Sequence, residues 1–328
     1  MQPTFSLDFP YAYGNPEATA NFRVEPEDFQ VDENLGFEPL GEGEHIYLRV
    51  WKRGENTAWV AEKIAELAKV AVMDVGYCGR KDRHAVTTQW FSVYLPKKEF
   101  ESDWKLLNSD SIKILSVTRH QHKLRRGDHQ TNQFIIRLRD LVVGNKQIFE
   151  QKLDAVLADG VPNYYGEQRF GNNANNLVEA HSILVEGKKI RDKQKRGLML
   201  SAARSYLFNQ VLAARVLAHS WKEMLSGEPE AFPSAPLWGR GRSAAGADTL
   251  AIESTAMDNW ASWRDGLEHV GLSQERRSTI LKPEAATWRW IEQDLEINFR
   301  LGSGEFATTI LRELAVLHSA IKTEAALV

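Results

Sequence analysis

The chain has 328 residues, of which 41 are Lys or Arg, 44 are Asp or Glu and one is Cys. Its composition, 43% hydrophobic and 26% charged, is typical of a globular protein, and a single cysteine excludes an intrachain disulfide framework and a zinc site built from several thiolates. The formal net charge of -3 weighs mildly against a nucleic-acid partner, because such proteins are usually basic. The sequence has no signal-peptide pattern and no apolar run long enough for a membrane span, so we expect a cytoplasmic protein without a membrane partner.

Strand and helix patterns alternate in the first third of the chain. Residues 45–51 alternate in polarity and predict a strand. A helix is expected to begin at Thr57, because apolar residues from Val60 to Ala71 share one stripe and Asn56 or Thr57 could cap its first turn. Residues 87–95 predict a second strand.

The character of the chain changes between residues 156 and 283, a stretch that could form a separate module. Within it, residues 198–221 are strongly helical, and residues 227–247 contain three prolines and read as an irregular loop. Residues 295–301 then predict a strand, and the spacing of apolar residues from 306 to 317 predicts a last helix. Few helical crossovers separate the strands, which favours an α+β fold with a largely antiparallel sheet.

Several motifs of known chemistry are absent or incomplete. Residues 239–244 and 302–307 match the loose G-x-G-x-x-A pattern, but only the second lies between an expected strand and an expected helix, and it is not followed by the strand with an acidic residue that a dinucleotide site requires. No serine-hydrolase elbow, zincin motif or P-loop is present. His120 and His122 fit a solvated basic surface better than a metal site. We therefore expect no nucleotide cofactor, no other cofactor and no metal.

A compact, charged segment punctuated by glycines lies at residues 76–85, between the expected helix and the second strand. Asp82 lies there with Lys81 and Arg83 on either side. Neighbouring cations favour an ionised carboxylate, which is available as a nucleophile or base at neutral pH. The same cations suit a substrate rich in phosphate. The alternative is an exposed loop with internal ion pairs.

The near-neutral total charge conceals a basic cluster at residues 119–139, which holds six Lys or Arg residues and three histidines. Affinity for nucleic acid depends on such local clusters rather than on net charge. The cations of this cluster that we expect to contact RNA are Lys123, Arg125 and Arg126. A second run, residues 188–196, has six cations and one acid, and such runs are usually solvated surfaces.

Three phenylalanines and an asparagine are candidates for binding a base. Asn132 and Phe134 lie two residues apart, so in a strand they share a face and offer an amide for a base edge beside a ring for stacking. Phe29 and Phe306 are flanked by acids and turn residues. For each phenylalanine the alternative is a core position, with Asn132 in a turn. Residues 162–171 combine aromatic, Arg and Gln side chains and suit either an RNA contact or a structural corner.

Six stretches, in the same order, resemble the TruD family of tRNA pseudouridine synthases, and together they span nearly the whole chain. They are residues 24–29 (VEPEDF), residues 79–85 (GRKDRHA) with Gln89, residues 123–127 (KLRRG) followed by Asn132 and Phe134, residues 162–171, residues 200–205 (LSAARS) with Phe208 and Asn209, and residues 306–308 with residues 311–314. Six collinear matches are far more specific than any one of them.

The resemblance implies an isomerase that converts uridine 13 of tRNA to pseudouridine without a cofactor. Asp82 corresponds to the catalytic aspartate of the family, and Phe29, Asn132 and Phe306 correspond to residues that contact the target nucleotide. Attack at C1′, attack at C6 and elimination remain open as the route, and Asp82 itself is one candidate for the base that removes the C5 proton. Lys81 and Arg83 could hold the carboxylate ionised or bind a phosphate, although a structural role for Lys81 is equally plausible.

The resemblance also implies a pseudouridine-synthase-type catalytic α+β domain with a mixed, largely antiparallel sheet. An inserted α+β domain, residues 156–283, interrupts it, so that residues 1–155 and 284–328 form the catalytic domain. The expected partner is tRNA, and the expected oligomeric state is a monomer. Glu305 departs from the family pattern, in which a small residue is common, and this puts the electrostatics beside Phe306 in question.

Two alternatives belong to other classes. The first is a noncatalytic RNA-binding protein that uses the same basic and aromatic surface. The second is a glycoside hydrolase with paired carboxylates, Glu27 and Asp28 against Asp82. Replacement of Asp82 separates the first alternative from an enzyme, since it would abolish catalysis and leave RNA binding largely intact.

Overall fold

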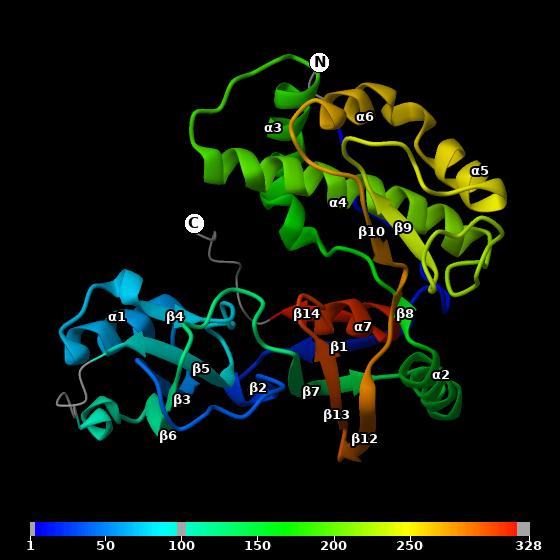
Figure 1. Ribbon diagram of the computed structural model, residues 1–328. Helices are drawn as coiled ribbons and strands as arrows, with labels where there is room; N and C mark the ends of the chain where they lie inside the picture. Colours follow the sequence, from blue (N-terminus) through cyan, green and yellow to red (C-terminus); the bar gives the residue numbers. More distant parts are fainter. Residues whose placement is uncertain (1–3, 97–102, 320–328) are drawn as a thin grey trace.

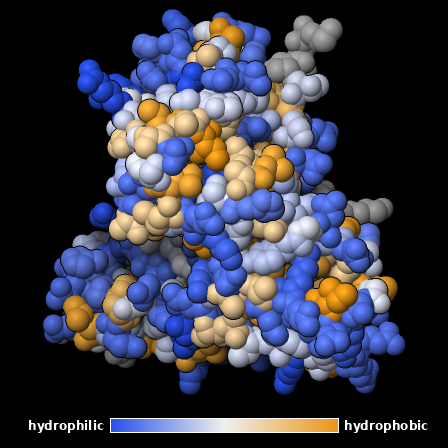
Figure 2. Space-filling view, turned by 90° about the vertical axis from the view of Figure 1, so that its right-hand side faces the viewer, coloured by the Kyte–Doolittle hydropathy of each residue, from blue (hydrophilic) through white to orange (hydrophobic). Residues whose placement is uncertain are grey.

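The computed structural model describes residues 4–96 and 103–319, which form two parts (Figure 1). A large sheet with helices packed on it forms the lower part in that view, and a mainly helical bundle forms the upper part. Seen from the side, both parts present a mostly hydrophilic surface, and hydrophobic residues gather mainly on the upper part (Figure 2). No helix among the described residues is long and apolar enough to cross a membrane.

The sheet of the lower part has ten strands and a central order of β12-β13-β7-β2-β5-β3-β6. Its strands are β1 (Ala18–Phe22), β2 (Phe29–Asn34), β3 (His45–Arg53), β4 (Val75–Tyr77), β5 (Val86–Tyr94), β6 (Ile112–His120), β7 (Thr131–Val142), β12 (Glu284–Ile291), β13 (Asp294–Gly302) and β14 (Ala315–Ser319). β2 and β5 are parallel, as are β1 and β14, whereas the other pairs are antiparallel. The expectation of an α+β fold with a mixed, largely antiparallel sheet is confirmed.

Three helices cover one face of this sheet in two separate groups. α2 (Lys146–Asp159) and α7 (Ala307–Leu314) share a core with β7 and β13, whereas α1 (Thr57–Ala68) shares a core with β3 and β5. The Asn56 side chain caps α1 by accepting a hydrogen bond from the backbone N–H of the second helical residue. Between the two groups, β2 and the start of β7 carry polar residues on the covered face.

The upper part has its own core, centred on the long helix α4 (Lys193–Leu217). Around it lie α3 (Asn175–Leu184), α5 (Ala247–Ala256), α6 (Ala261–Glu268) and the antiparallel pair β9 (Ser234–Leu237) and β10 (Glu275–Ser278). Where the chain passes between the parts, β8 (Val161–Pro162) pairs with β11 (Ile280–Leu281). The N-terminal segment also joins this core, because the ring of Phe9 stacks on Tyr164 at 5.3 Å.

Short 3-10 helices complete the secondary structure. They are η1 (Pro26–Asp28), η2 (Val72–Asp74), η3 (Trp104–Leu107), η4 (Glu167–Phe170), η5 (Asn172–Ala174) and η6 (Asp258–Trp260).

The structure corrects the expected elements in three places. The last helix ends at Leu314, and Leu317 lies instead on β14, whose pairing with β1 outweighs the helical spacing of the apolar residues. β9 lies inside the stretch expected to be loop; its proline is tolerated because β9 pairs with a single neighbour. α4 begins at Lys193, earlier than expected, because the Asp192 side chain accepts hydrogen bonds from two backbone N–H groups of its first turn.

Candidate active site

Asp82 lies on the loop between β4 and β5, and side chains of α1 and β3 hold the backbone of that loop. Thr57, at the start of α1, accepts a hydrogen bond from the Lys81 backbone N–H at 3.0 Å. Lys52 of β3 is fully buried, and its Nζ donates to the Asp82 carbonyl oxygen at 3.3 Å and to the Glu55 carbonyl oxygen at 2.8 Å. These bonds fix the position of Asp82 from beneath while its side chain remains 46% exposed.

Arg23 supplies the charge partner of Asp82. Its Nη2 lies 2.8 Å from Asp82 Oδ2, and the Arg23 side chain is only 13% exposed. The guanidinium carbon lies 4.2 Å from the ring centre of Phe29 and 4.8 Å from that of Phe22. The aromatic rings therefore orient the guanidinium, and the guanidinium orients the carboxylate.

The Lys81 side chain forms a buried ion pair with Glu33 of β2. Its Nζ lies 2.7 Å from Glu33 Oε2 and donates to Asn132 Oδ1 at 2.8 Å. The Lys81 side chain is 8% exposed and that of Glu33 is fully buried. Arg23, and not Lys81, therefore makes the contact with the Asp82 carboxylate. The ion pair with Glu33 gives Lys81 a structural role, which was one of the alternatives for this residue. Arg83 is exposed on the loop.

The Asn132 amide joins this pair to a buried histidine. Its Nδ2 lies 3.0 Å from His129 Nε2, and both residues are buried. Because Lys81 can only donate, its contact fixes Oδ1 of Asn132 toward Lys81 and Nδ2 toward His129. Burial and the positive charge of Lys81 lower the pKa of His129, which favours the neutral ring that accepts from Asn132.

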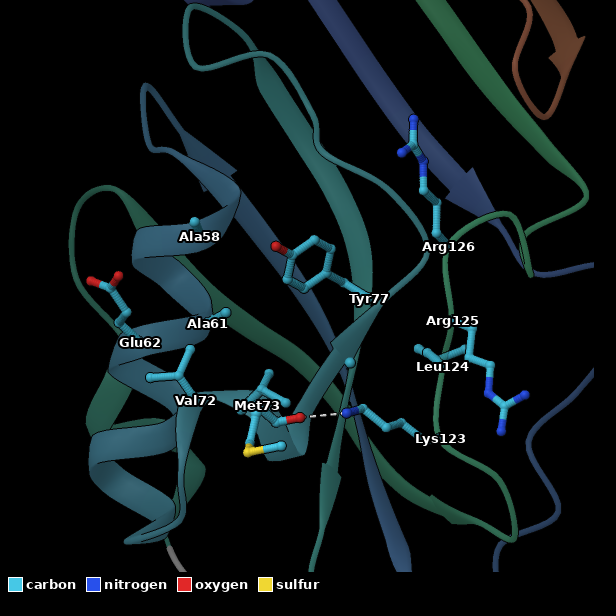
Figure 3. A pocket seen from close by; sticks show the side chains of 12 residues that line it. Ala58, Ala61, Glu62, Val72, Met73, Tyr77, Lys123, Leu124, Arg125 and Arg126 are labelled. Atoms are coloured by element: carbon cyan, nitrogen blue, oxygen red, sulfur yellow. Dashed lines mark hydrogen bonds between the residues drawn. The ribbon is translucent and has the colours of Figure 1, made fainter. Parts of the chain in front are cut away.

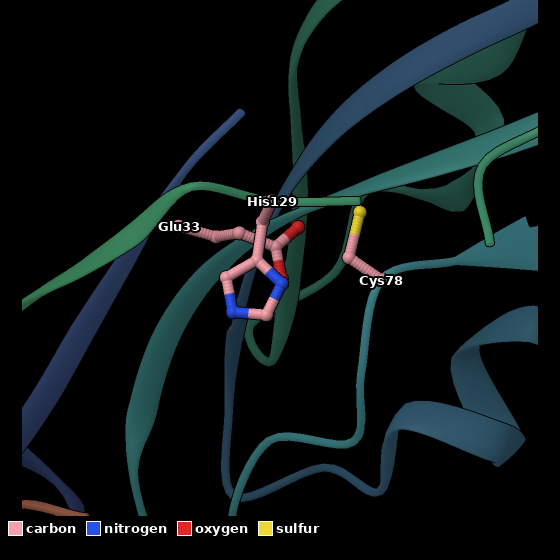
Figure 4. A group of neighbouring side chains, drawn as sticks. All are labelled: Glu33, Cys78 and His129. Carbon is pink, nitrogen blue, oxygen red and sulfur yellow. The ribbon is translucent and has the colours of Figure 1, made fainter. Parts of the chain in front are cut away.

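Glu33, Cys78 and His129 form the one group among the described residues whose ligand atoms lie close enough to suggest a metal site, within 4.8 Å of one another (Figure 4). Two observations argue against a cation there. The ammonium of Lys81 already compensates Glu33, and burial raises the pKa of the Cys78 thiol, which keeps it protonated and a poor ligand. This group is better described as the buried support of the Asp82 loop.

The three candidate phenylalanines lie in different environments. Phe306 is 48% exposed, whereas Phe29 and Phe134 are 3% and 7% exposed. Phe134 packs between Phe29 and Phe299, with ring centres 5.9 and 5.6 Å away, so it occupies the core position that the sequence left as the alternative. Phe29 reaches the site through Arg23, which covers its ring. Asn132 lies in a strand and not in a turn.

The strand register places the start of the turn that carries Phe306 beside Asn132. Leu301 pairs with Asn132 across β13 and β7, and the backbone N–H of Ser303 donates to the Gln130 carbonyl at 3.1 Å. The turn from Gly302 to Phe306 therefore begins beside Asn132. Glu305 lies within this turn and accepts a hydrogen bond from the Gly302 backbone N–H at 2.7 Å, so its carboxylate has a local partner.

The predicted basic residues lie on the loop that follows β6. The loop is bound to the chain just before Asp82, because the Gly127 N–H donates to the Cys78 carbonyl at 2.8 Å. Arg125 and Arg126 are exposed, whereas the Nζ of Lys123 donates to the Met73 carbonyl.

Residues 162–171 lie in the upper part and form a structural corner. Asn209 accepts from the Tyr165 backbone N–H and donates to its carbonyl, both at 2.9 Å, and Arg169 donates to Ser205 at 3.2 Å. Burial lowers the pKa of Arg169, and the positive charges of Arg126 and Arg277 contribute.

Glu27 and Asp28 do not lie free beside Asp82 as a second catalytic carboxylate would. Glu27 pairs with Arg53 at 2.6 Å, and the buried Asp28 pairs with Arg139 at 2.8 Å. The engagement of both carboxylates by arginines weighs against the glycoside hydrolase alternative.

Comparisons with known proteins agree with these observations. A family model for tRNA pseudouridine synthase D (TruD) matches residues 9–191. The tRNA pseudouridine synthase D of Cellvibrio japonicus is 58% identical over 322 residues, which cover 97% of this chain and 96% of that protein. The chain belongs to the TruD family. The TruD protein of Aeromonas hydrophila is 45% identical, with 93% of each chain covered.

A solved structure supports the TruD fold. The crystal structure described as that of tRNA pseudouridine synthase D (TruD) from Methanosarcina mazei has a TM-score of 0.70 and 19% identity. The match covers 93% of this chain and 95% of that chain. At this identity the likeness concerns the fold alone, and it extends over both parts of the molecule.

The site of this TruD-family protein includes residues that the sequence did not single out. Arg23, Lys52 and Glu33 contact Asp82, its backbone and Lys81, respectively. For Glu33 a signal existed, because an acid on the buried face of a strand needs a partner. For Arg23 and Lys52, no spacing or composition marks the contact.

Proposed function

We propose that this protein is a tRNA pseudouridine synthase, an isomerase that converts uridine 13 of tRNA to pseudouridine with Asp82 as its nucleophile. The observation that carries the proposal is the half-exposed Asp82 carboxylate held at 2.8 Å by the shielded Arg23 guanidinium. Membership of the TruD family supplies the reaction class and the tRNA substrate.

The chemistry requires the uridine to leave the RNA stack, which costs a few kcal/mol. The exposed ring of Phe306 offers a surface on which the flipped base restacks. Asn132, beside which the turn that carries Phe306 begins, is assigned the contact with the uracil edge, through the hydrogen-bonding capacity that its amide retains beyond Lys81 and His129. Phe29 contributes to nucleotide binding through the guanidinium that it supports. The family resemblance implies that Phe29, Asn132 and Phe306 contact the target nucleotide, and these roles say what each residue would contribute.

Asp82 then promotes cleavage of the N1–C1′ bond, by attack at C1′, by attack at C6 or by elimination. The base rotates, C5 bonds to C1′, and the C5 proton is removed, with Asp82 as one candidate base. The product is an isomer of the substrate, so the atoms balance without a co-reactant. Arg23 orients the carboxylate for the first step.

The inserted domain is part of the same proposal. We place its limits at the β8–β11 pair, because the boundary expected at residue 156 falls inside α2 and the second core begins after that pair.

On the catalytic domain, Arg125, Arg126 and Arg83 provide cations for tRNA phosphates. A monomer and a cytoplasmic location accompany the tRNA substrate as predictions.

The test is direct mapping of pseudouridine in a tRNA transcript treated with the protein. The expected result is modification at position 13 and none in a transcript with cytidine at that position. Modification at a different position would refute the site assignment, and a transcript without any pseudouridine would refute the activity.

A further inference from the structure

A hollow of about 540 Å³ lies beside the Asp82 loop, with the basic residues of the loop after β6 on one side and a wall that has no role in the site described above on the other (Figure 3). One wall is formed by the first turns of α1 and by η2, and the other by residues 123–126 of the loop after β6. β4, which leads into the Asp82 loop, lies between the walls, and the side chain of Tyr77 projects into the hollow (Figure 3).

The two walls differ in chemistry. Val72 and Met73 on the first wall are 50% and 79% exposed, so these two adjacent residues present an apolar surface to solvent. Arg125 and Arg126 on the opposite wall are exposed cations. A hollow lined by an apolar wall on one side and by exposed arginines on the other suits a nucleotide, whose base is flat and apolar and whose phosphate is anionic.

Two residues in the lining of the hollow directly neighbour residues that contact the Asp82 loop or the arginine-bearing loop. Ala58 in its lining directly follows Thr57, which accepts from the backbone N–H of Lys81 at 3.0 Å. Tyr77 precedes Cys78, whose carbonyl binds the loop that carries the arginines. Any ligand in the hollow is therefore held by the same segments that position Asp82.

The hollow is also built before any ligand binds. The Nζ of Lys123 donates to the Met73 carbonyl and so ties the two walls together (Figure 3). A second hollow of about 420 Å³, which contains His45 and His122, shares Lys123 and Arg125 with the first. The basic surface thus continues past Lys123, as an extended RNA backbone would require.

We propose that the first hollow binds an unpaired nucleotide of the tRNA that flanks the flipped uridine. Its base contacts Val72, Met73 and Tyr77, and its phosphate binds Arg125 and Arg126. This inference rests on the proposed function and adds a second nucleotide site to it. A volume of about 540 Å³ is within the usual range of ligand pockets, roughly 300–1,000 Å³.

The experiment compares M73E and M73Q with the matched control L217E in steady-state pseudouridine formation on a tRNA transcript. Leu217 is 71% exposed at the end of α4, so L217E introduces the same charge on a surface outside the hollow. Both substitutions of Met73 are expected to raise KM about fivefold, with kcat within about twofold of the wild type, because the contact serves binding alone. L217E is expected to match the wild type.

The other outcomes are distinct. An active wild type with M73E and M73Q indistinguishable from L217E would overturn the flanking-nucleotide site and leave the proposed function intact. A raised KM in M73E but not in M73Q would reduce the effect to charge repulsion and overturn the apolar contact with a base. A wild type that forms no pseudouridine would overturn the proposed function and this inference with it.

Discussion

Arg23 and Asp82 form an ion pair across 59 residues of sequence, with Arg23 Nη2 at 2.8 Å from Asp82 Oδ2. Arg23 has a left-handed backbone with a φ of 57°, directly after the last residue of β1. Its guanidinium lies over the Phe29 ring, and this contact shields one side of the pair from solvent. The pair explains how an exposed carboxylate can be oriented before substrate arrives.

Replacement of Arg23 tests this relationship. R23A removes a charge-assisted hydrogen bond worth about 2 kcal/mol, so we expect kcat to fall about tenfold or more in pseudouridine formation. The matched control is R49A, because Arg49 of β3 makes an ion pair of the same length, 2.8 Å, with Asp32 of β2, on the other side of β5 in the sheet. A kcat for R23A within about twofold of that for R49A would show that the pair has no role in catalysis.

The buried pair of Lys81 and Glu33 predicts a strong coupling in stability. K81M leaves a fully buried carboxylate uncompensated and is expected to lower the free energy of unfolding by about 3 kcal/mol. The double variant K81M/E33Q removes that carboxylate as well and should recover part of the loss. Urea denaturation of the two single variants and the double variant measures the coupling, and strictly additive losses would argue against it.

The two phenylalanines assigned to nucleotide binding should respond differently to truncation. Phe306 is 48% exposed, so F306A should leave thermal stability nearly unchanged and impair pseudouridine formation. Phe29 is 3% exposed in the core, so F29A should cost about 3 kcal/mol of stability. Thermal denaturation alongside kinetics separates them. A large loss of stability in F306A, or normal activity, would contradict its role as a stacking surface.

Lys52 predicts a characteristic dependence of stability on pH. Burial lowers the pKa of Lys52 from 10.5 to about 8, although the charge of Asp82 acts in the opposite direction. Between these values the unfolded chain binds a proton that the folded chain has released, so this group makes stability rise with pH. Below pH 8 both states are protonated and its contribution is constant.

The substitution K52M removes this group. The unfolding free energy of the wild type minus that of K52M should therefore increase by about 2 kcal/mol from pH 8 to pH 10. Urea denaturation at a series of pH values gives this difference and cancels the titration of other groups. A difference that stays constant across this range would show that Lys52 keeps its ordinary pKa.

The sequence could predict the parts of the site that depend on local pattern. The stripe of apolar residues and the cap at Asn56 define the start of α1, and period-two alternation predicts the strands at residues 45–51 and 87–95 that become β3 and β5. The glycine-punctuated motif singles out Asp82 as a charged loop residue. Each of these features depends on residues close to one another along the chain.

The contacts that complete the site are not local and could not be predicted in this way. Arg23 reaches Asp82 only because its backbone is left-handed and Phe29 supports its side chain. The sequence left open whether Lys81 holds the Asp82 carboxylate, binds a phosphate or has a structural role, and the structure pairs it with Glu33, a partner supplied by β2. The extra strand β14 likewise depends on the edge that β1 offers.

The central claim is that Asp82 performs the isomerisation on a bound tRNA. The most direct measurement compares the wild type with D82N on the same tRNA transcript, with pseudouridine mapped at position 13 and tRNA binding measured in parallel. The account predicts no pseudouridine with D82N and a tRNA affinity close to that of the wild type. Pseudouridine formation by D82N at the rate of the wild type would contradict it.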